Sequence, residues 1–138
     1  MNVRTVSIIC PVYNEEKFID RCVKSIIAQD YPKDSLEVLF IDGRSTDRTR
    51  EMIEKYTKEN PYIHLLDNPQ QVVPYALNKG VEESTGEVVM RIDGHCAYPT
   101  NYVSELVRYL YELNADNVGG VWNTQPAKDT AVCQAIAL

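Results

Sequence analysis

The sequence predicts an α/β fold, with a mainly parallel β-sheet that carries helices on both faces. Short β-branched runs alternate with segments of helical periodicity along the whole 138-residue chain, which is typical of successive β-α units. The first two runs are apolar almost without interruption, as expected for strands that are covered on both sides. The length suits a single domain. No repeat, linker or low-complexity stretch divides the chain.

Five strands are expected, at residues 6–10, 37–42, 62–66, 87–93 and 117–122. The runs VSIIC and EVLFID predict buried strands, whereas the third run, YIHLL, is a weaker signal. The fifth run contains Gly119 and Gly120, which allow close backbone approach.

Five helices are expected, at residues 18–29, 45–59, 73–84, 101–113 and 129–138. In the first helix, Phe18, Cys22 and Ile26 fall on one face at four-residue spacing. Residues 45–47 offer capping side chains to the second helix. The last segment, DTAVCQAIAL, has a helical pattern that stops in mid-period.

Composition limits the classes of function. The chain has 14 basic and 20 acidic residues, for a net charge of −6. This argues against general nucleic-acid binding, since no basic stripe is present to displace phosphate counterions. An acidic protein that handles an anionic substrate needs backbone N–H groups or a bound cation.

Cysteine usage and hydropathy predict a cytoplasmic location. The four cysteines show no C-x-x-C pairing, which fits a reducing compartment, and Cys10 and Cys22 are expected in the core. The N-terminus has no signal-peptide pattern, and no apolar run is long enough to cross a membrane.

Parallel sheets bind ligands beyond the carboxyl ends of their strands, so these positions are the candidate site. After the first strand, Pro11 turns the chain outward, Tyr13 offers an aromatic face to a planar base, and the amides of residues 14–16 suit an anion. A plain turn with a helix cap is the alternative. After the second strand, Asp42 offers an oxygen to the imide N–H of a uracil. Here too a turn with a cap is the alternative, and Asp47 is expected to be only a cap.

The fourth strand ends in Asp93-Gly94-His95. A carboxylate and an imidazole suit a divalent cation such as Mn²⁺, with a diphosphate completing the coordination. Alone, the tripeptide favours an Asp-Gly turn with a solvated histidine. The convergence of polar residues from three strand ends favours the metal site. Neither G-x-G-x-x-G nor G-x-x-x-x-G-K-[ST] occurs, so a dinucleotide fingerprint and a P-loop are absent from the sequence.

Three stretches resemble a known family: SIICPVYNEEKFIDRCVKSIIAQDYP, LEVLFIDGRSTDRT and ALNKGVEESTGEVVMRIDGH. Over about residues 5–122 they resemble the N-terminal half of family 2 glycosyltransferases, which have the GT-A fold with its Rossmann-like nucleotide-binding half. The resemblance implies a nucleotide-sugar donor, usually a UDP-sugar, and a divalent metal, Mn²⁺ or Mg²⁺. The stretch RIDGHCAYP also resembles a branch associated with succinoglycan-type exopolysaccharide synthesis.

The resemblance carries donor-binding residues onto matching positions of this chain: Pro11, Val12, Tyr13 and Glu15 for the base, Asp42 as the base-contacting carboxylate with Arg44 beside it, Asn78 and Gly80 in the N-x-G helix segment, and Asp93. Asp93 and His95 match the D-x-D metal motif, with His95 in place of the second aspartate. Leu77 stands where many relatives carry arginine, which removes one phosphate contact.

The implied activity is transfer of a sugar from a nucleotide diphosphate to a saccharide or lipid-linked acceptor in polysaccharide biosynthesis, with inversion. The alternative is a non-catalytic nucleotide-binding or scaffolding module. A sugar nucleotidyltransferase is rejected, because its Gly-rich, Arg-containing N-terminal loop is absent.

Family members continue well beyond this length. We therefore expect residues 1–138 to be one truncated nucleotide-sugar-binding domain, without the acceptor half and the catalytic base, and without full transferase activity. No nucleic-acid partner is expected. Association with the inner face of a membrane is expected only through segments outside these residues.

Overall fold

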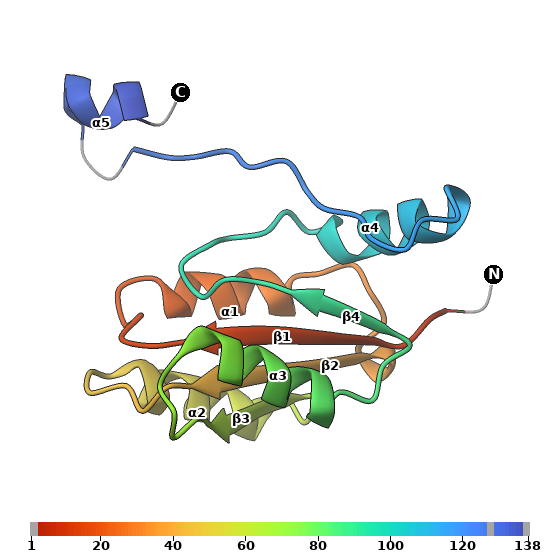
Figure 1. Ribbon diagram of the computed structural model, residues 1–138, viewed down its shortest axis with the longest axis horizontal. Helices are drawn as coiled ribbons and strands as arrows, with labels where there is room; N and C mark the ends of the chain where they lie inside the picture. The colour runs from red at the N-terminus through yellow and green to blue at the C-terminus, as the bar shows by residue number, and fades with distance from the viewer. Residues whose placement is uncertain (1–2, 127–128, 137–138) are drawn as a thin grey trace.

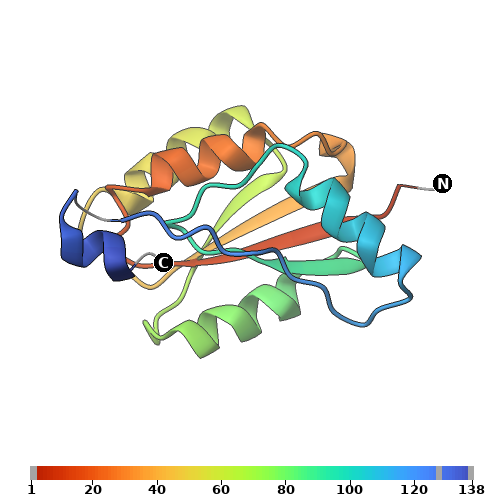
Figure 2. The same ribbon diagram turned by 90° about the horizontal axis from the view of Figure 1, so that it is seen from above.

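The computed structural model describes residues 3–126 and 129–136 and is built in layers around one parallel sheet. The sheet has the strand order β3-β2-β1-β4. Helices α1 and α2 cover one face and α3 covers the other, as Figures 1 and 2 show. The predicted α/β class, with helices on both faces of a parallel sheet, is confirmed.

The strands are β1 (Val6–Val12), β2 (Leu36–Asp42), β3 (Ile63–Asp67) and β4 (Val88–Arg91). The helices are α1 (Ile19–Ile27), α2 (Thr49–Glu59), α3 (Val73–Glu83), α4 (Tyr102–Glu112) and α5 (Ala131–Ile136), with a 3₁₀ turn at Lys33–Ser35. Within the described ranges, no helix is long and apolar enough to cross a membrane.

The prediction of a fifth strand at residues 117–122 is wrong. These residues form no strand, and β4 has no partner on its outer edge among the described residues. Instead the segment runs past α4 (Figure 1). Gly120 lies against the Tyr102 ring, where an added Cβ would come within 2.7 Å of a ring carbon. The close approach that the glycines allow is therefore to an aromatic ring and not to a neighbouring strand.

Each face of the sheet has its own core, because side chains alternate between the two faces of a strand. Val6, Ile8, Cys10 and Phe40 pack with the helices α1, α2 and α4. The smaller core consists of Ile9, Leu39, Ile41 and Ala76, under α3. The predicted core positions of Cys10 and Cys22 are confirmed. Burial raises the pKa of the Cys10 thiol, which keeps it protonated.

Gly80 sets how closely α3 approaches the sheet. A Cβ added there would lie 2.9 Å from Cγ2 of Ile9 and 3.1 Å from Cδ1 of Ile41, and both isoleucines are buried. We expect Gly80→Val to lower the free energy of unfolding by about 2–3 kcal/mol through overpacking. Urea denaturation measures this loss. Gly119→Val is the control, because nothing lies within 4 Å of its Cβ position. Equal stability of the two variants would contradict the packing role of Gly80.

Candidate functional site

The winding of the sheet predicts where a ligand binds. The chain winds from β1 through β2 to β3 and then returns to place β4 on the other side of β1. Ligands of such sheets bind beyond the carboxyl ends of the strands, at this reversal. A pocket of about 270 Å³ lies there. Its lining comes from the ends of all four strands and the start of α3: Pro11, Val12, Tyr13, Glu15, Ile41, Gly43, Asn68, Gln71, Val72, Val73, Ala76, Arg91, Asp93, Gly94 and His95.

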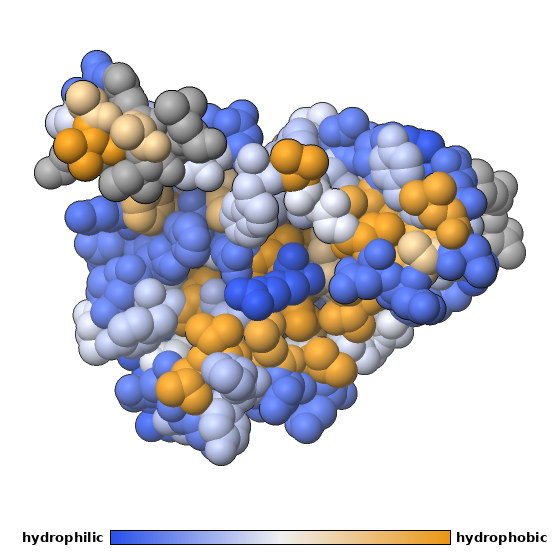
Figure 3. All heavy atoms as spheres, turned by 45° about the horizontal axis from the view of Figure 1, so that its top comes forward, coloured by the Kyte–Doolittle hydropathy of each residue, from blue (hydrophilic) through white to orange (hydrophobic). Residues whose placement is uncertain are grey.

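The pocket lies on the α3 side of the strand ends. Ile41 and Ala76 line it and also belong to the core beneath α3. The N-cap residue of α3, Val72, and its first residue, Val73, also line the pocket, and both are about half exposed. Figure 3 shows a band of apolar side chains across the face that carries β4, bordered by hydrophilic groups. An apolar lining with a few polar groups is typical of small-molecule sites.

Asp42 does not line this pocket, although the sequence predicts that it contacts a base. Its neighbour Ile41 points toward α3, so the alternation of a strand turns Asp42 to the opposite face, where it is fully buried. Its oxygens accept hydrogen bonds from the amide (3.2 Å) and hydroxyl (2.6 Å) of Ser45, and one lies 3.3 Å from the Arg50 guanidinium. In this arrangement the Asp42 carboxylate does not face the pocket, and its contact with a base stays a prediction.

A hydrogen-bond network joins the loops that follow β1 and β2. Asn14 has a left-handed backbone (φ 52°), and its Oδ1 accepts the amide N–H of Thr46 (2.8 Å) and of Asp47 (3.3 Å). The amide of Glu15 donates to the hydroxyl of Thr49 (2.7 Å).

Asp47 accepts the N–H of Thr49, the first residue of α2 (2.9 Å), and the N–H of Glu16 in the loop after β1 (3.1 Å). It stands one residue before Arg48, the N-cap of α2, so it supports the start of the helix from outside the N-cap position and also joins the two loops. Burial alone would raise the pKa of Asp47, but its hydrogen bonds to Thr49 lower it overall.

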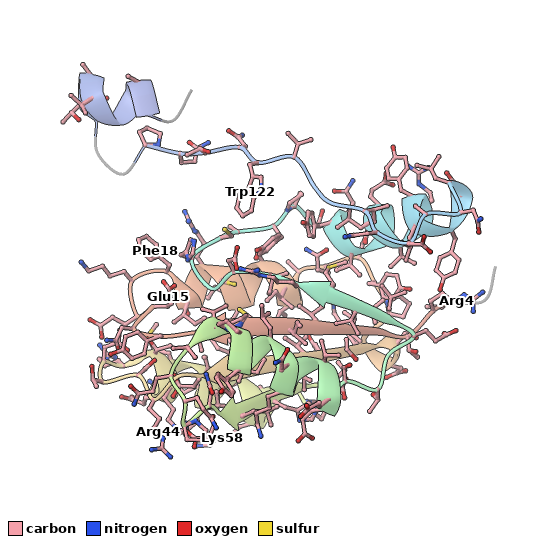
Figure 4. All side chains as sticks on the ribbon, viewed as in Figure 1. Arg4, Glu15, Phe18, Arg44, Lys58 and Trp122 are labelled. Atoms are coloured by element: carbon pink, nitrogen blue, oxygen red, sulfur yellow. The ribbon has the colours of Figure 1, made fainter. Side chains whose placement is uncertain are left out.

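His95 and Glu15 meet across the pocket, although they lie 80 residues apart in the sequence. His95 Nδ1 is 3.1 Å from an oxygen of Glu15. An ionised carboxylate only accepts, so Nδ1 carries the proton that it donates. The Nε2 atom of a neutral His95 then keeps its lone pair for a cation, which is the usual arrangement of a metal-binding histidine with a carboxylate behind it. Figure 4 shows Glu15 close to the loop that follows β4.

Asp93 is held from three directions. Its Oδ1 lies 3.2 Å from the Arg91 guanidinium, and its amide N–H donates to the hydroxyl of Tyr98 (2.9 Å). Cys22 lies beneath, with its Sγ 3.6 Å from the Asp93 carbonyl oxygen. Burial raises the pKa of Tyr98, so this hydroxyl stays neutral. Within the described part of the chain, Oδ2 of Asp93 has no hydrogen-bond partner and is available to a ligand.

The donor set fits a divalent cation only if the ligand supplies most of the coordination. No group of three or more His, Cys, Asp or Glu side chains among the described residues could enclose a metal ion. Oδ2 of Asp93 and Nε2 of His95 are two suitable atoms on the pocket wall. Mg²⁺ and Mn²⁺ bound through one or two side chains plus substrate phosphates and water match this arrangement.

The structure brings most, but not all, of the predicted site residues together. Pro11, Val12, Tyr13, Glu15, Asp93 and His95 line the pocket. Arg44 lies elsewhere, paired with Asp67 at 3.3 Å, and Figure 4 shows it at the lower edge of the molecule. Asn78 is exposed two residues along α3 from the buried Ala76, which places it on the outer side of the helix. Gly80 packs on the sheet.

Three polar pocket residues, Asn68, Gln71 and Arg91, were not predicted as site residues. Gln71 lies in the loop that follows β3. Asn68 directly follows β3, so the same search at strand ends would have found it. Arg91 is the one basic residue in the apolar run of the fourth strand, and that was its only signal.

Comparison with known proteins places these observations in a family. The family model described as "Glycosyl transferase family 2" matches residues 7–132. A dolichyl N-acetyl-α-D-glucosaminyl phosphate 3-β-D-2,3-diacetamido-2,3-dideoxy-β-D-glucuronosyltransferase of Methanococcus voltae is 38% identical over 68% of this chain. The succinoglycan biosynthesis protein ExoA of Rhizobium meliloti is 33% identical over 80% of it. The chain spans 30% and 34% of the lengths of these two relatives.

Among solved structures, the mannosyltransferase PcManGT of Pyrobaculum calidifontis, in complex with GDP-Man and Mn²⁺, superposes with a TM-score of 0.74. It is 30% identical in sequence, and the match covers 80% of this chain and 33% of that one.

Proposed function

This chain belongs to glycosyl transferase family 2, and we propose that its pocket binds the nucleotide-diphosphate sugar whose glycosyl group the enzyme transfers. One observation carries the proposal: a single pocket borders the ends of all four parallel strands, with Asp93 and His95 at one end of it. Neighbouring strands lie about 4.8 Å apart, so the strand ends extend over about 14 Å from β3 to β4. An extended nucleoside diphosphate fits along that length.

The two ends of the pocket differ in chemistry, which orients the donor. Tyr13, Gly43 and Gln71 lie near the ends of β1, β2 and β3, and they offer an aromatic face and backbone groups. Arg91 is the last residue of β4, and Asp93 and His95 follow it. We assign the base to the first end and the diphosphate to the second. The sequence predicts uracil, and the GDP-Man complex of the mannosyltransferase supports guanine as a second candidate.

At the diphosphate end, Oδ2 of Asp93 and Nε2 of His95 would hold Mn²⁺ or Mg²⁺, as the Mn²⁺ complex of the mannosyltransferase supports. When bound, the cation would neutralise charge that develops on the departing diphosphate. Glu15 fixes the tautomer of His95 through Nδ1. Arg91 restrains Asp93 and adds a positive charge next to the phosphates.

We propose that transfer inverts the anomeric centre: the acceptor oxygen bonds to the anomeric carbon as the bond to the diphosphate breaks on the opposite side. A base outside these residues takes the proton of the acceptor hydroxyl. The acceptor is a saccharide, free or lipid-linked. The names of two relatives support this acceptor class. One is a glucuronosyltransferase named for a dolichyl N-acetyl-α-D-glucosaminyl phosphate, and the other is a succinoglycan biosynthesis protein.

Thermal unfolding with a panel of donors tests the proposed function. We expect UDP-, GDP- or dTDP-sugars to raise the melting temperature, and to do so more strongly with Mn²⁺ than without it. A ligand at 100 times its Kd stabilises the folded state by about 2.7 kcal/mol. No stabilisation by any nucleotide sugar, with or without metal, would overturn the assignment. Stabilisation without donor hydrolysis or transfer, in a protein that includes an acceptor site, would favour a non-catalytic binding module.

Arg91 gives a second test, because its charge should act on the phosphates and not on the nucleoside. We expect Arg91→Met to weaken UDP binding about 10- to 150-fold, since a charge-assisted hydrogen bond contributes about 1.5–3 kcal/mol. Uridine affinity should not change. Calorimetry with both ligands measures the difference. Arg108→Met is the matched control, because Arg108 pairs with Glu105 and Glu112 on α4, away from the pocket. Equal losses for UDP and uridine would contradict the phosphate role.

A further inference from the structure

Asn68 is a buried amide on the pocket wall. It follows the last residue of β3, and only 2% of its surface is exposed. Its backbone is fixed on both sides, because its N–H donates to the Asp42 carbonyl (2.8 Å) and its carbonyl accepts the N–H of Gln71 (3.1 Å). Its side-chain Nδ2 donates to the carbonyl of Val72 (3.1 Å).

This last bond settles which way the amide points. The Val72 carbonyl also accepts the N–H of Ala76 at the start of α3, and a carbonyl oxygen can only accept. Nδ2 must therefore face Val72, and Oδ1 must point away from it. The structure gives Oδ1 no partner among the described residues. No fully enclosed side-chain nitrogen or oxygen in those residues lacks a partner, so Oδ1 reaches open space. The open space that Asn68 borders is the pocket.

We propose that Oδ1 of Asn68 accepts a hydrogen bond from the donor's base and thereby selects the base, an inference that rests on the proposed function. In this proposal Asn68, and not Asp42, makes the contact with the base. Asn68 is hydrogen-bonded to the backbone of Asp42, but it lines the pocket. A Cβ placed on Gly43 would lie 3.5 Å from Gln71 and 3.6 Å from the Tyr13 ring. These groups form the uncharged end of the pocket, where the base is assigned.

The selected class follows from hydrogen-bond direction. At the centre of the pairing edge, uracil and thymine present N3–H and guanine presents N1–H, whereas cytosine and adenine present an acceptor nitrogen. Oδ1 has no hydrogen to give, and Nδ2 is already used. A base with an acceptor there would leave two acceptors facing each other. A site built around a hydrogen bond strongly rejects an analogue that cannot form it.

Calorimetry on the wild-type protein gives the first test. We expect UDP, dTDP or GDP to bind at least about 10-fold more tightly than CDP and ADP. Equal binding of all five nucleotides would overturn the selection by Asn68 while leaving the proposed function intact. Binding of none of them would overturn the proposed function itself.

A second test combines a ligand change with a protein change. N3-methyl-UDP lacks the donor hydrogen, so we expect it to bind the wild type at least about 10-fold more weakly than UDP. In Asn68→Ala that difference should disappear, because the acceptor is gone. Gln70→Ala is the control, since Gln70 is an exposed amide in the same loop and does not line the pocket. The same methyl penalty in the wild type and Asn68→Ala would show that another group accepts the N–H. If Asn68→Ala does not fold, the nucleotide panel on the wild type decides.

Discussion

Replacing Asp93 with alanine should abolish the gain in UDP affinity that Mn²⁺ provides, a loss of about 100-fold or more, since even the supporting partners of metal ligands are worth 10–100-fold. Asp93 supplies a carboxylate oxygen on β4's side of the pocket, Oδ2, that has no protein partner in the described chain. Affinity without metal should not fall, because the lost charge repelled the diphosphate. Calorimetry with Mn²⁺ and with a chelator measures both quantities. An unchanged gain from Mn²⁺ in Asp93→Ala would remove Asp93 from the metal site.

The same calorimetric experiment tests whether His95 is a metal ligand. His95→Asp restores two carboxylates at this position, and we expect preference to move from Mn²⁺ toward Mg²⁺, because a carboxylate is a harder ligand than imidazole. His64→Asp is the matched control. His64 is the other of the two histidines, and it lies on β3 outside the pocket. If His95→Asp and His64→Asp leave the ratio of Mg²⁺ to Mn²⁺ affinity equally unchanged, Asp93-Gly94-His95 is a turn with a solvated histidine.

The second large effect is expected at Asp42, on stability. Its buried carboxylate is held by Ser45 and Arg50. Asp42→Ala should lower the free energy of unfolding by about 2–3 kcal/mol, as for lost hydrogen bonds to a charged group. Asp67→Ala is the control. Asp67 is level with Asp42 on β3 and also pairs with arginine, but it is half exposed, so its loss should cost at most about 1 kcal/mol.

Nucleotide binding separates the two roles considered for Asp42. Because Asp42 does not reach the pocket, its replacement should weaken UDP and ADP binding by the same factor, through a looser loop after β2. A loss confined to UDP, in a folded variant, would instead restore the direct contact with uracil. Chemical denaturation and calorimetry on the same preparations give both measurements.

The sequence by itself determined the elements and the edge of the sheet at which they converge. Strands and helices are local patterns with periods of 2.0 and 3.6 residues, so they can be read from a short window. That reading placed β1 to β4 and α1 to α5 in order. It also placed Asp93 and His95 at a strand end, because parallel strands bring their carboxyl ends together.

Only the tertiary structure decided which face of the sheet holds the pocket. Every strand end offers one side chain to each face, so the pattern could not distinguish Asp42, which is buried beneath α2, from Ile41, which lines the pocket. The tertiary structure also decided which residues distant in sequence come into contact. Glu15 and His95 form a hydrogen bond although they are 80 positions apart in the sequence. The outcome for residues 117–122 has the same cause, since a strand forms only where the chain lies alongside the edge of another strand, and this segment runs past α4 instead. No local pattern records where the chain will lie relative to the sheet.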